Sequence, residues 1–440
     1  MLKRMRQTVL TRRLDGWLDP ADAYLAVCGE ADEAFWLDSG VDAVAGWSYL
    51  GVPSAVRLPG TGVLDAVRVE PVPAAADAPP FALGTVFWLG YEVRAETTGV
   101  PVSRASGHPD AALLDVDRML AFDHARREVL LVARGAEWTP ELERWAEGVV
   151  TALEAPPRHP AHDPVATGAV WAYDDATYRR MILDCQAAIR AGEAYQLCLT
   201  NQATVEVSPD PVAAYLALRR ASPAHHGGLL RAAGVALLGA SPELFLTVTP
   251  DGTVRTSPIK GTRPRGADAA SDAALIAELA RDEKELAENL MIVDLMRNDL
   301  GRVCEVGSVA VTALHRVESY AQVHQLVSTV QGRLASGRLV ADVIRACFPA
   351  GSMTGAPKIR ATEILDLLEA RPRGLYSGAF GYLGSDGALE LAMTIRSIVV
   401  DAERSTVGAG GGITALSVPE REVEEVRWKA RALLAVLGAS

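Results

Sequence analysis

Residues 234–249 read GVALLGASPELFLTVT and give the clearest strand signal in the chain. Two apolar runs flank a Ser-Pro turn, a pattern that predicts a pair of strands. Further strand-like runs occur at residues 34–40, 84–93, 194–200 and 376–400, the last as a hairpin whose turn is SDG. Strand pairs are therefore a main building element of the chain.

Helical patterns alternate with these strand pairs in the second part of the chain. Residues 178–191 place apolar side chains at helical spacing, and residues 273–299 predict one long helix closed by Gly301. A last helix is expected from about Pro419 to Leu437, with proline at its first turn. The combination predicts an α+β fold.

Composition limits the classes of partner. The 440 residues carry 43 basic and 55 acidic side chains, a formal net charge of −12. An acidic surface repels phosphate backbones, so we expect neither nucleic acid nor an anionic membrane as a partner. No apolar run is long enough to predict a membrane-spanning helix. The hydrophobic content of 49% excludes intrinsic disorder.

Five cysteines lie far apart and form no CxxC pair. An odd number at wide spacing argues against a disulfide framework and against a zinc site. We therefore expect a chain adapted to the reducing cytoplasm.

Two pairs of acidic residues stand three positions apart on predicted helices. Glu285 and Glu288 form one pair, and Glu422 and Glu425 form the other. Residues at this spacing project from one face of a helix, so two such helices could converge on Mg²⁺. The alternative is that both pairs are solvated helix faces.

The glycine run VGAGGGI, residues 407–413, follows a β-like segment and precedes the last helix. Consecutive glycines allow backbone N–H groups to approach an anion closely, such as a phosphate or a carboxylate. The alternative is a tight turn between a strand and a helix.

Several charged side chains stand in contexts that suggest chemistry. Lys260 lies in SPIKGTRPRG, where Arg263 and Arg265 could lower its pKa and make it nucleophilic. Glu243 follows a hydrophobic strand and is a candidate general acid. Arg396 and Lys429 are cations within apolar runs, so each is expected to have an anionic partner. A solvated surface charge is the alternative for Lys260 and Glu243.

The order of these motifs resembles one family, the chorismate-binding enzymes. The similar stretches cover roughly residues 172–435: SPELF, PIKGTRPRG, AENLMIVDLMRNDLGRV, FPAGSMTGAPKIRA, YSGAFGY, TIRS, and GAGGGI followed by PEREVEEVRWKA. The first part, with FWLDSG, GWSYLG and WLGYEV, resembles the N-terminal half of anthranilate synthase component I and of the aminodeoxychorismate branch. A Pro-rich stretch at residues 154–168 separates an N-terminal region, 1–155, from a chorismate-binding region, 170–437.

The resemblance implies a fold of two packed antiparallel β-sheets with helices outside. It implies amination of chorismate at C4 to 4-amino-4-deoxychorismate, for para-aminobenzoate and folate synthesis, with ammonia from a separate glutaminase subunit. Lys260 would attack C2 while Glu243 protonates the C4 hydroxyl. Mg²⁺ would be held by Glu288 and Glu425, with Glu285 and Glu422 acting through water. The substrate-binding residues it implies are Thr354, Tyr376, Arg396, Gly410, Gly411, Gly412 and Lys429.

Single positions separate the members of the family. Gln196 stands where the water-adding members carry a lysine base, and Lys260 stands where anthranilate synthases typically carry alanine. Asn289 also resembles the aminodeoxychorismate branch. The family often has histidine at the position of Gln325, whereas this chain has His324 one place earlier, on the opposite side of a strand. Anthranilate synthase component I is the alternative, and a non-catalytic chorismate or tryptophan sensor is a more distant one.

Overall fold

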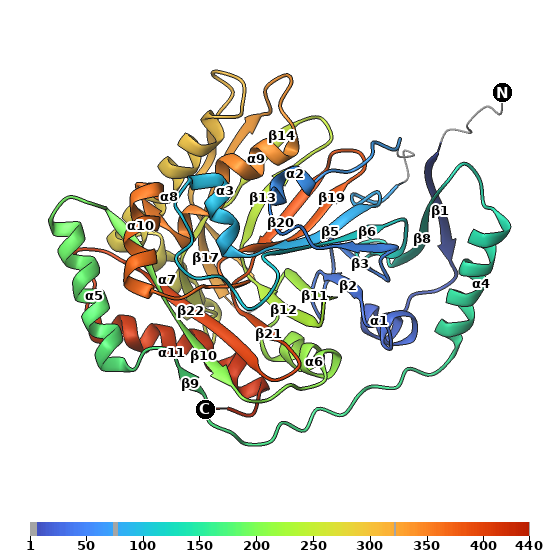
Figure 1. Cartoon of the computed structure of the whole chain (residues 1–440), viewed down its shortest axis with the longest axis horizontal. Coiled ribbons are helices and arrows are strands. Elements are labelled where there is room, and N and C mark those ends of the chain that lie inside the picture. Colours follow the sequence, from blue (N-terminus) through green and yellow to red (C-terminus); the bar gives the residue numbers. More distant parts are fainter. Residues whose placement is uncertain (1–6, 74–77, 321–322, 440) are drawn as a thin grey trace.

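The computed structural model describes residues 7–73, 78–320 and 323–439 of the chain. Two β-sheets of 12 and 10 strands form the centre of the molecule, and every pair of neighbouring strands in them is antiparallel (Figure 1). The predicted class, α+β with two packed antiparallel sheets, is confirmed. Within the described residues, no helix combines the length and the apolar character needed to cross a membrane.

The 12-stranded sheet follows the order β1-β8-β7-β3-β2-β11-β12-β21-β22-β10-β18, with β9 paired to β10. Its strands are β1 (Thr8–Leu14), β2 (Ala34–Asp38), β3 (Trp47–Gly51), β7 (Arg118–Asp123), β8 (Glu128–Gly135), β9 (Val170–Trp171), β10 (Gln196–Val205), β11 (His226–Ala232), β12 (Val235–Ser241), β18 (Gly355–Ala356), β21 (Ser397–Val400) and β22 (Ser405–Ile413).

The 10-stranded sheet follows the order β15-β17-β14-β13-β20-β19-β5-β6-β4, with β16 paired to β17. Its strands are β4 (Ala55–Arg57), β5 (Gly84–Leu89), β6 (Ala111–Val116), β13 (Leu244–Val248), β14 (Thr253–Thr256), β15 (Ile259–Pro264), β16 (Ala310–Ser319), β17 (Val323–Arg333), β19 (Ala379–Gly384) and β20 (Leu389–Met393).

The two sheets pack face to face because their strands are apolar on both sides. In β12, Leu237 belongs to the core between the sheets and Leu238 to the core beneath the helices. In β5, Trp88 belongs to the core between the sheets and Phe87 to the core beneath the helices of the other sheet. Side chains of a strand alternate between its two faces, so continuous apolar runs are typical of such central strands.

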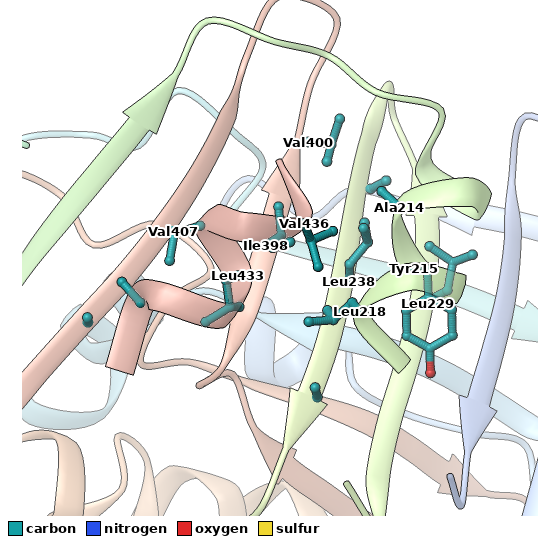
Figure 2. Close-up of a cluster of buried hydrophobic side chains, with 14 of the residues drawn as sticks. Ala214, Tyr215, Leu218, Leu229, Leu238, Ile398, Val400, Val407, Leu433 and Val436 are labelled. Carbon is teal, nitrogen blue, oxygen red and sulfur yellow. The ribbon is translucent and has the colours of Figure 1, made fainter. Parts of the chain in front are cut away.

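Helices cover the outer faces of both sheets (Figure 1). Over the 12-stranded sheet lie α1 (Pro20–Cys28), α4 (Pro140–Glu154), α5 (Asp175–Arg190), α6 (Pro211–Ala221), α10 (Lys358–Glu369) and α11 (Pro419–Val436). Over the 10-stranded sheet lie α2 (Val63–Ala66), α8 (Glu283–Gly301) and α9 (Val340–Cys347). Figure 2 shows the contact of α6 and α11 with the sheet, where Leu218 and Leu433 meet Leu238 and Ile398.

Both sheets take strands from both sides of the boundary at residues 154–168. The strands β1 to β8 come from the N-terminal side, and they are distributed over the two sheets together with later strands. The two regions, 1–155 and 170–437, therefore share one pair of sheets. The boundary between them stays a prediction.

Several elements differ from the sequence prediction. The helix expected over residues 273–299 is two helices, α7 (Ala269–Leu279) and α8, because Asp282 caps a new helix with its carboxylate. Gly301 is the last residue of α8, but it does not adopt the left-handed conformation of a closing glycine. The hairpin expected over residues 376–400 ends with β20, and β21 joins the other sheet.

The glycine run also differs. Residues 407–413 are neither a turn nor a loop but most of β22, which pairs with β10 from Val205↔Ser405 to Leu197↔Ile413. Glycine is unfavourable inside a strand unless another group must approach closely. The expected turn alternative is therefore wrong, and the reason for the glycines lies in what packs on them. The final helix, α11, ends at Val436, within one residue of the predicted end.

Candidate active site

Acidic side chains gather where α8 and α11 approach each other. Glu288 on α8 and Glu422 on α11 are both buried. The ammonium of Lys284 lies between them, with Nζ 3.8 Å from Oε1 of Glu288 and 3.9 Å from Oε1 of Glu422. Two carboxylates from different elements thus converge on one cation.

The outer members of the two acidic pairs have different surroundings. Oε1 of Glu285 lies 4.0 Å from Nη1 of Arg263. Oε1 of Glu425 lies 2.6 Å from Nζ of Lys429, one turn further along α11. Of the four predicted carboxylates, Glu288 and Glu422 are therefore the two that share an ion-pair contact with Lys284.

The pKa values of these carboxyl groups follow from burial and mutual repulsion. Burial raises the pKa of Glu422, and the charges of Glu425 and Glu288 raise it further. Burial, then Glu288, raises the pKa of Glu285. Burial raises the pKa of Glu425, but Lys429, Lys284 and Lys260 together lower it by more, so the pKa is lowered. An added cation would relieve the repulsion within the cluster.

The donor set can be compared with the needs of Mg²⁺. Among the described residues, no three acidic, histidine or cysteine side chains lie close enough together to hold a metal as they stand. Mg²⁺ needs fewer, since it usually binds one or two carboxylates and keeps several waters. Glu288 and Glu422 supply two oxygen donors around the position of an ammonium ion. The residues present fit Mg²⁺ once Lys284 moves aside.

Lys260 lies next to this cluster, on β15. Its Nζ is 3.6 Å from Oε2 of Glu288. Burial pulls the pKa of Lys260 down, but Glu288, Cys198 and Glu243 push it up by more, and the pKa is raised. The pKa depression expected from the two neighbouring arginines is therefore wrong for this state of the site.

Those two arginines are occupied elsewhere. Arg263 donates to Glu278 and Asp282, and Arg265 binds Asp272 with both arms of its guanidinium. Their charges are thus compensated by carboxylates of the loop and helices that follow β15.

Glu243 occupies the turn between β12 and β13 and is buried. Burial raises the pKa of Glu243 to about 7, although the ammonium of Lys260 opposes the shift. A carboxyl group with this pKa is half protonated near neutral pH and can donate a proton to a departing group. The environment of Glu243 agrees with the role of general acid.

Close contacts of neighbouring side chains with the backbone of β22 explain why this strand is rich in glycine. A β-carbon at Gly408 would lie 2.1 Å from Cγ of Tyr376, whose ring packs on the bare backbone. A β-carbon at Gly412 would lie 1.9 Å from Nε2 of Gln196 and 3.4 Å from Nζ of Lys260. A side chain at Gly408 would displace the ring of Tyr376, and one at Gly412 would displace the carboxamide of Gln196, so glycine keeps both groups in the site.

Among the described residues, one edge of this strand has no partner strand beyond Val407. All of β22 pairs with β10, whereas β21 pairs with it only from Ser405 to Val407. The carbonyl of Gly410 accepts a hydrogen bond from Nζ of Lys429 at 2.8 Å. Gly410, Gly411 and Gly412 therefore run along the unpaired part of the strand, at the place where the sequence predicts a ligand carboxylate.

Two other predicted binding residues are buried. Burial raises the pKa of Tyr376 far above its ordinary value, so its hydroxyl stays protonated. Thr354 is fully buried, and its hydroxyl donates to the carbonyls of Ala350 and Gly351 in its own loop. Thr354 lies next to β10, where Cys198 donates its N–H to the Thr354 carbonyl.

Gln196 and Lys284 are not among the predicted binding and metal residues. Gln196, the first residue of β10, is 1% exposed, and neither polar atom of its carboxamide has a hydrogen-bond partner among the described residues. An unpartnered buried carboxamide is costly and indicates a missing ligand. The signal for Lys284 is its position four residues before Glu288 on one helix face.

Three residues that the sequence comparison with the family singled out, His324, Gln325 and Asn289, are all buried in the structure. His324 is fully buried on β17 and contacts Ser319 and Asp272, away from Lys260. Gln325, its neighbour in the strand, is also buried. Asn289 donates from Nδ2 to the carbonyls of Pro258 and Leu326, and so ties α8 to the start of β15, which carries Lys260, and to the adjacent strand β17.

The chain belongs to the family of chorismate-binding enzymes, whose sequence profile matches residues 62–435. It is 42% identical to an aminodeoxychorismate synthase of Streptomyces pristinaespiralis, over 95% of this chain and 64% of that protein. It is 39% identical to anthranilate synthase component 1 of Streptomyces coelicolor, over 96% of this chain and 87% of that protein. The crystal structure of anthranilate synthase component I from Streptococcus pneumoniae superposes with a TM-score of 0.75 at 28% identity, covering 98% and 93% of the two chains.

The chain thus spans just under two thirds of the length of the first of these relatives. The match with the solved structure extends over both sheets and agrees with the predicted fold.

Proposed function

We propose that this chain catalyses the Mg²⁺-dependent amination of chorismate at C4, giving 4-amino-4-deoxychorismate for para-aminobenzoate and folate synthesis. The observation that carries the proposal is the position of Lys260, a partly buried amine between the acidic cluster and the glycine strand. The resemblance places alanine there in anthranilate synthases and a nucleophilic lysine in the aminodeoxychorismate branch. The 42% identity to an aminodeoxychorismate synthase supports the same branch.

The substrate carries two carboxylates, and the charges around the site suggest an orientation for them. Arg396 and Lys429 would bind the enolpyruvyl carboxylate, with Tyr376 and the backbone of Gly410 to Gly412 beside it. Arg396 supports this assignment because, among the described residues, its guanidinium donates to a backbone carbonyl and forms no ion pair with a carboxylate. Thr354 would line the site from its buried loop.

The ring carboxylate would face the acidic cluster, where a cation is needed. Mg²⁺ held by Glu288 and Glu425, with Glu422 acting through water, would neutralise these groups and anchor that carboxylate. Glu425 would then exchange its ion pair with Lys429 for the metal, which frees Lys429 for the substrate. The convergence of Glu288 and Glu422 on Lys284 supports a cation position there. Glu285 would act only through water, since it faces Arg263.

The reaction would proceed by two displacements. The unprotonated amine of Lys260 attacks C2, both ring double bonds shift, and the C4 hydroxyl leaves as water with the proton of Glu243. Ammonia then adds at C4, the double bonds shift back, and the C2–N bond breaks to release the lysine amine. Covalent catalysis thus divides one difficult displacement of hydroxide into two easier steps. The second shift restores the original diene and leaves nitrogen at C4.

We also propose a glutamine amidotransferase subunit as the source of ammonia, and a reducing cytoplasm as the compartment. The five cysteines are free and buried, which supports a reducing environment. The chain alone is expected to use ammonium salts, and addition of a matching glutaminase is expected to confer use of glutamine. Glutamine hydrolysis by this chain alone would contradict the assignment of that step to a partner.

One assay separates this function from the alternative, anthranilate synthesis. The purified chain is incubated with chorismate, ammonium and Mg²⁺, and the product is identified by mass and fluorescence. The proposal predicts 4-amino-4-deoxychorismate that retains the enolpyruvyl group. Formation of anthranilate with release of pyruvate would assign the chain to the other branch. Binding of chorismate without formation of any product would favour a sensor.

A parallel reaction with excess chelator is expected to be inactive, and full activity there would contradict the metal assignment.

A further inference from the structure

Arg396 is held in an unusual way for a partly buried cation. Its backbone φ is +50°, in the left-handed region that side-chain-bearing residues rarely adopt. Nη1 donates to the carbonyl of Lys429 at 2.9 Å, and within the described part of the chain the guanidinium forms no ion pair. Backbone strain of this kind persists where the surroundings hold a functional group in place.

Trp428 supplies the second contact of that guanidinium. The Cζ atom of Arg396 lies 5.0 Å from the centroid of the Trp428 ring, within the range of cation–π attraction. The indole is 56% exposed, although it is among the largest apolar side chains of the protein. Trp428 directly precedes Lys429 on α11, so one turn of helix contributes both contacts.

We propose that Trp428 is a positioning residue, which holds the guanidinium of Arg396 flat for a substrate carboxylate and shields that pair from water. The inference rests on the proposed function, since the carboxylate is that of chorismate. The indole of Trp428 covers one face of the guanidinium, and the Lys429 carbonyl accepts from Nη1. The remaining N–H groups of the guanidinium can therefore bind the ligand. Water excluded by the indole would strengthen the resulting ion pair.

A second arginine–tryptophan contact on the same helix shows what a purely structural contact looks like. The Cζ atom of Arg427 lies 4.0 Å from the centroid of the Trp171 ring, but Arg427 also forms an ion pair with Asp175. Its charge is balanced without a ligand. Trp171 is therefore a matched control: it makes the same kind of contact with the neighbouring residue, away from the site.

The test compares Trp428→Leu, Trp428→Phe and Trp171→Leu with the unmodified chain. Leucine removes the π face, whereas phenylalanine keeps one. We expect Trp428→Leu to raise KM and the calorimetric dissociation constant for chorismate about 3- to 30-fold, with kcat changed by less than about threefold. Trp428→Phe should recover most of the affinity, and Trp171→Leu should match the unmodified chain.

The possible outcomes distinguish failure of this inference from failure of the proposed function. Unchanged chorismate affinity in Trp428→Leu, or equal losses in the phenylalanine and leucine variants, would overturn the positioning role. A loss of kcat with unchanged affinity would also overturn it, because a structural role alone predicts that pattern. Failure of the unmodified chain to bind chorismate would refute the proposed function itself.

Discussion

Replacement of Lys284 by methionine should strengthen metal binding at the acidic cluster. In the structure Nζ of Lys284 lies 3.8 Å and 3.9 Å from carboxylate oxygens of Glu288 and Glu422. A cation that binds these oxygens must displace the ammonium, and the uncharged side chain of the Lys284→Met variant would offer no competition. Methionine keeps most of the length of the side chain and removes its charge.

The size of the effect follows from the exposure of the lysine. Its side chain is 50% exposed, so each ion pair is worth about 0.2–1 kcal/mol. Two pairs together correspond to an affinity for Mg²⁺ about 2- to 30-fold higher in Lys284→Met, at fixed ionic strength.

Metal binding can be measured directly by electron paramagnetic resonance of free Mn²⁺, with Mg²⁺ as the competitor. Arg297→Met is the matched control, because Arg297 lies on the same helix and pairs with exposed Asp294 at 2.7 Å. The affinity of this control variant for the metal should equal that of the unmodified chain. An unchanged or lower affinity in Lys284→Met would refute the competition, and absence of Mn²⁺ binding in the unmodified chain would refute the metal site.

Two further predictions concern the pH dependence and the stability. Glu243 must be protonated and has a pKa of about 7, whereas Lys260 must be unprotonated and its pKa is raised, so kcat/KM should rise with pH up to about 7 and then level off. Glu243→Gln, which cannot lose or donate that proton, should lose most activity, and an unchanged pH profile in this variant would exclude the role. Arg373 and Glu369 form a buried ion pair, with Glu369 also accepting from Thr200. Removal of one partner leaves a buried charge, so Arg373→Met should lower the free energy of unfolding by about 3–5 kcal/mol in urea titrations. A loss below about 1 kcal/mol would show that the pair is not stabilising.

Sequence patterns predict the elements whose signals are local. The Ser-Pro turn between β12 and β13 and the proline at the start of α11 each lie within a few residues of the element they define. The break before α8 also has a local signal, the capping residue Asp282, but the apolar spacing continues across it. The continuous spacing therefore predicts one helix where the structure has two.

Non-local contacts are beyond sequence reasoning. Residues 407–413 form a strand because they pair with β10, which lies far earlier in the chain, and no nearby residue shows this. The pKa of Lys260 is set by Glu288 and Glu243, not by the arginines adjacent in sequence. The partners of Lys284 and Trp428 lie on different elements for the same reason. The residues of the site can be named from the motifs, whereas their charges and contacts depend on the fold.

The central claim is covalent catalysis by Lys260 at C2 of chorismate. Its most direct measurement is mass spectrometry of the chain quenched during turnover, together with product analysis of Lys260→Ala. We predict an added mass of chorismate less one water on the peptide that contains Lys260, and loss of the 4-amino product in Lys260→Ala. A near-normal yield of 4-amino-4-deoxychorismate from Lys260→Ala, with no adduct in the unmodified chain, would contradict the account.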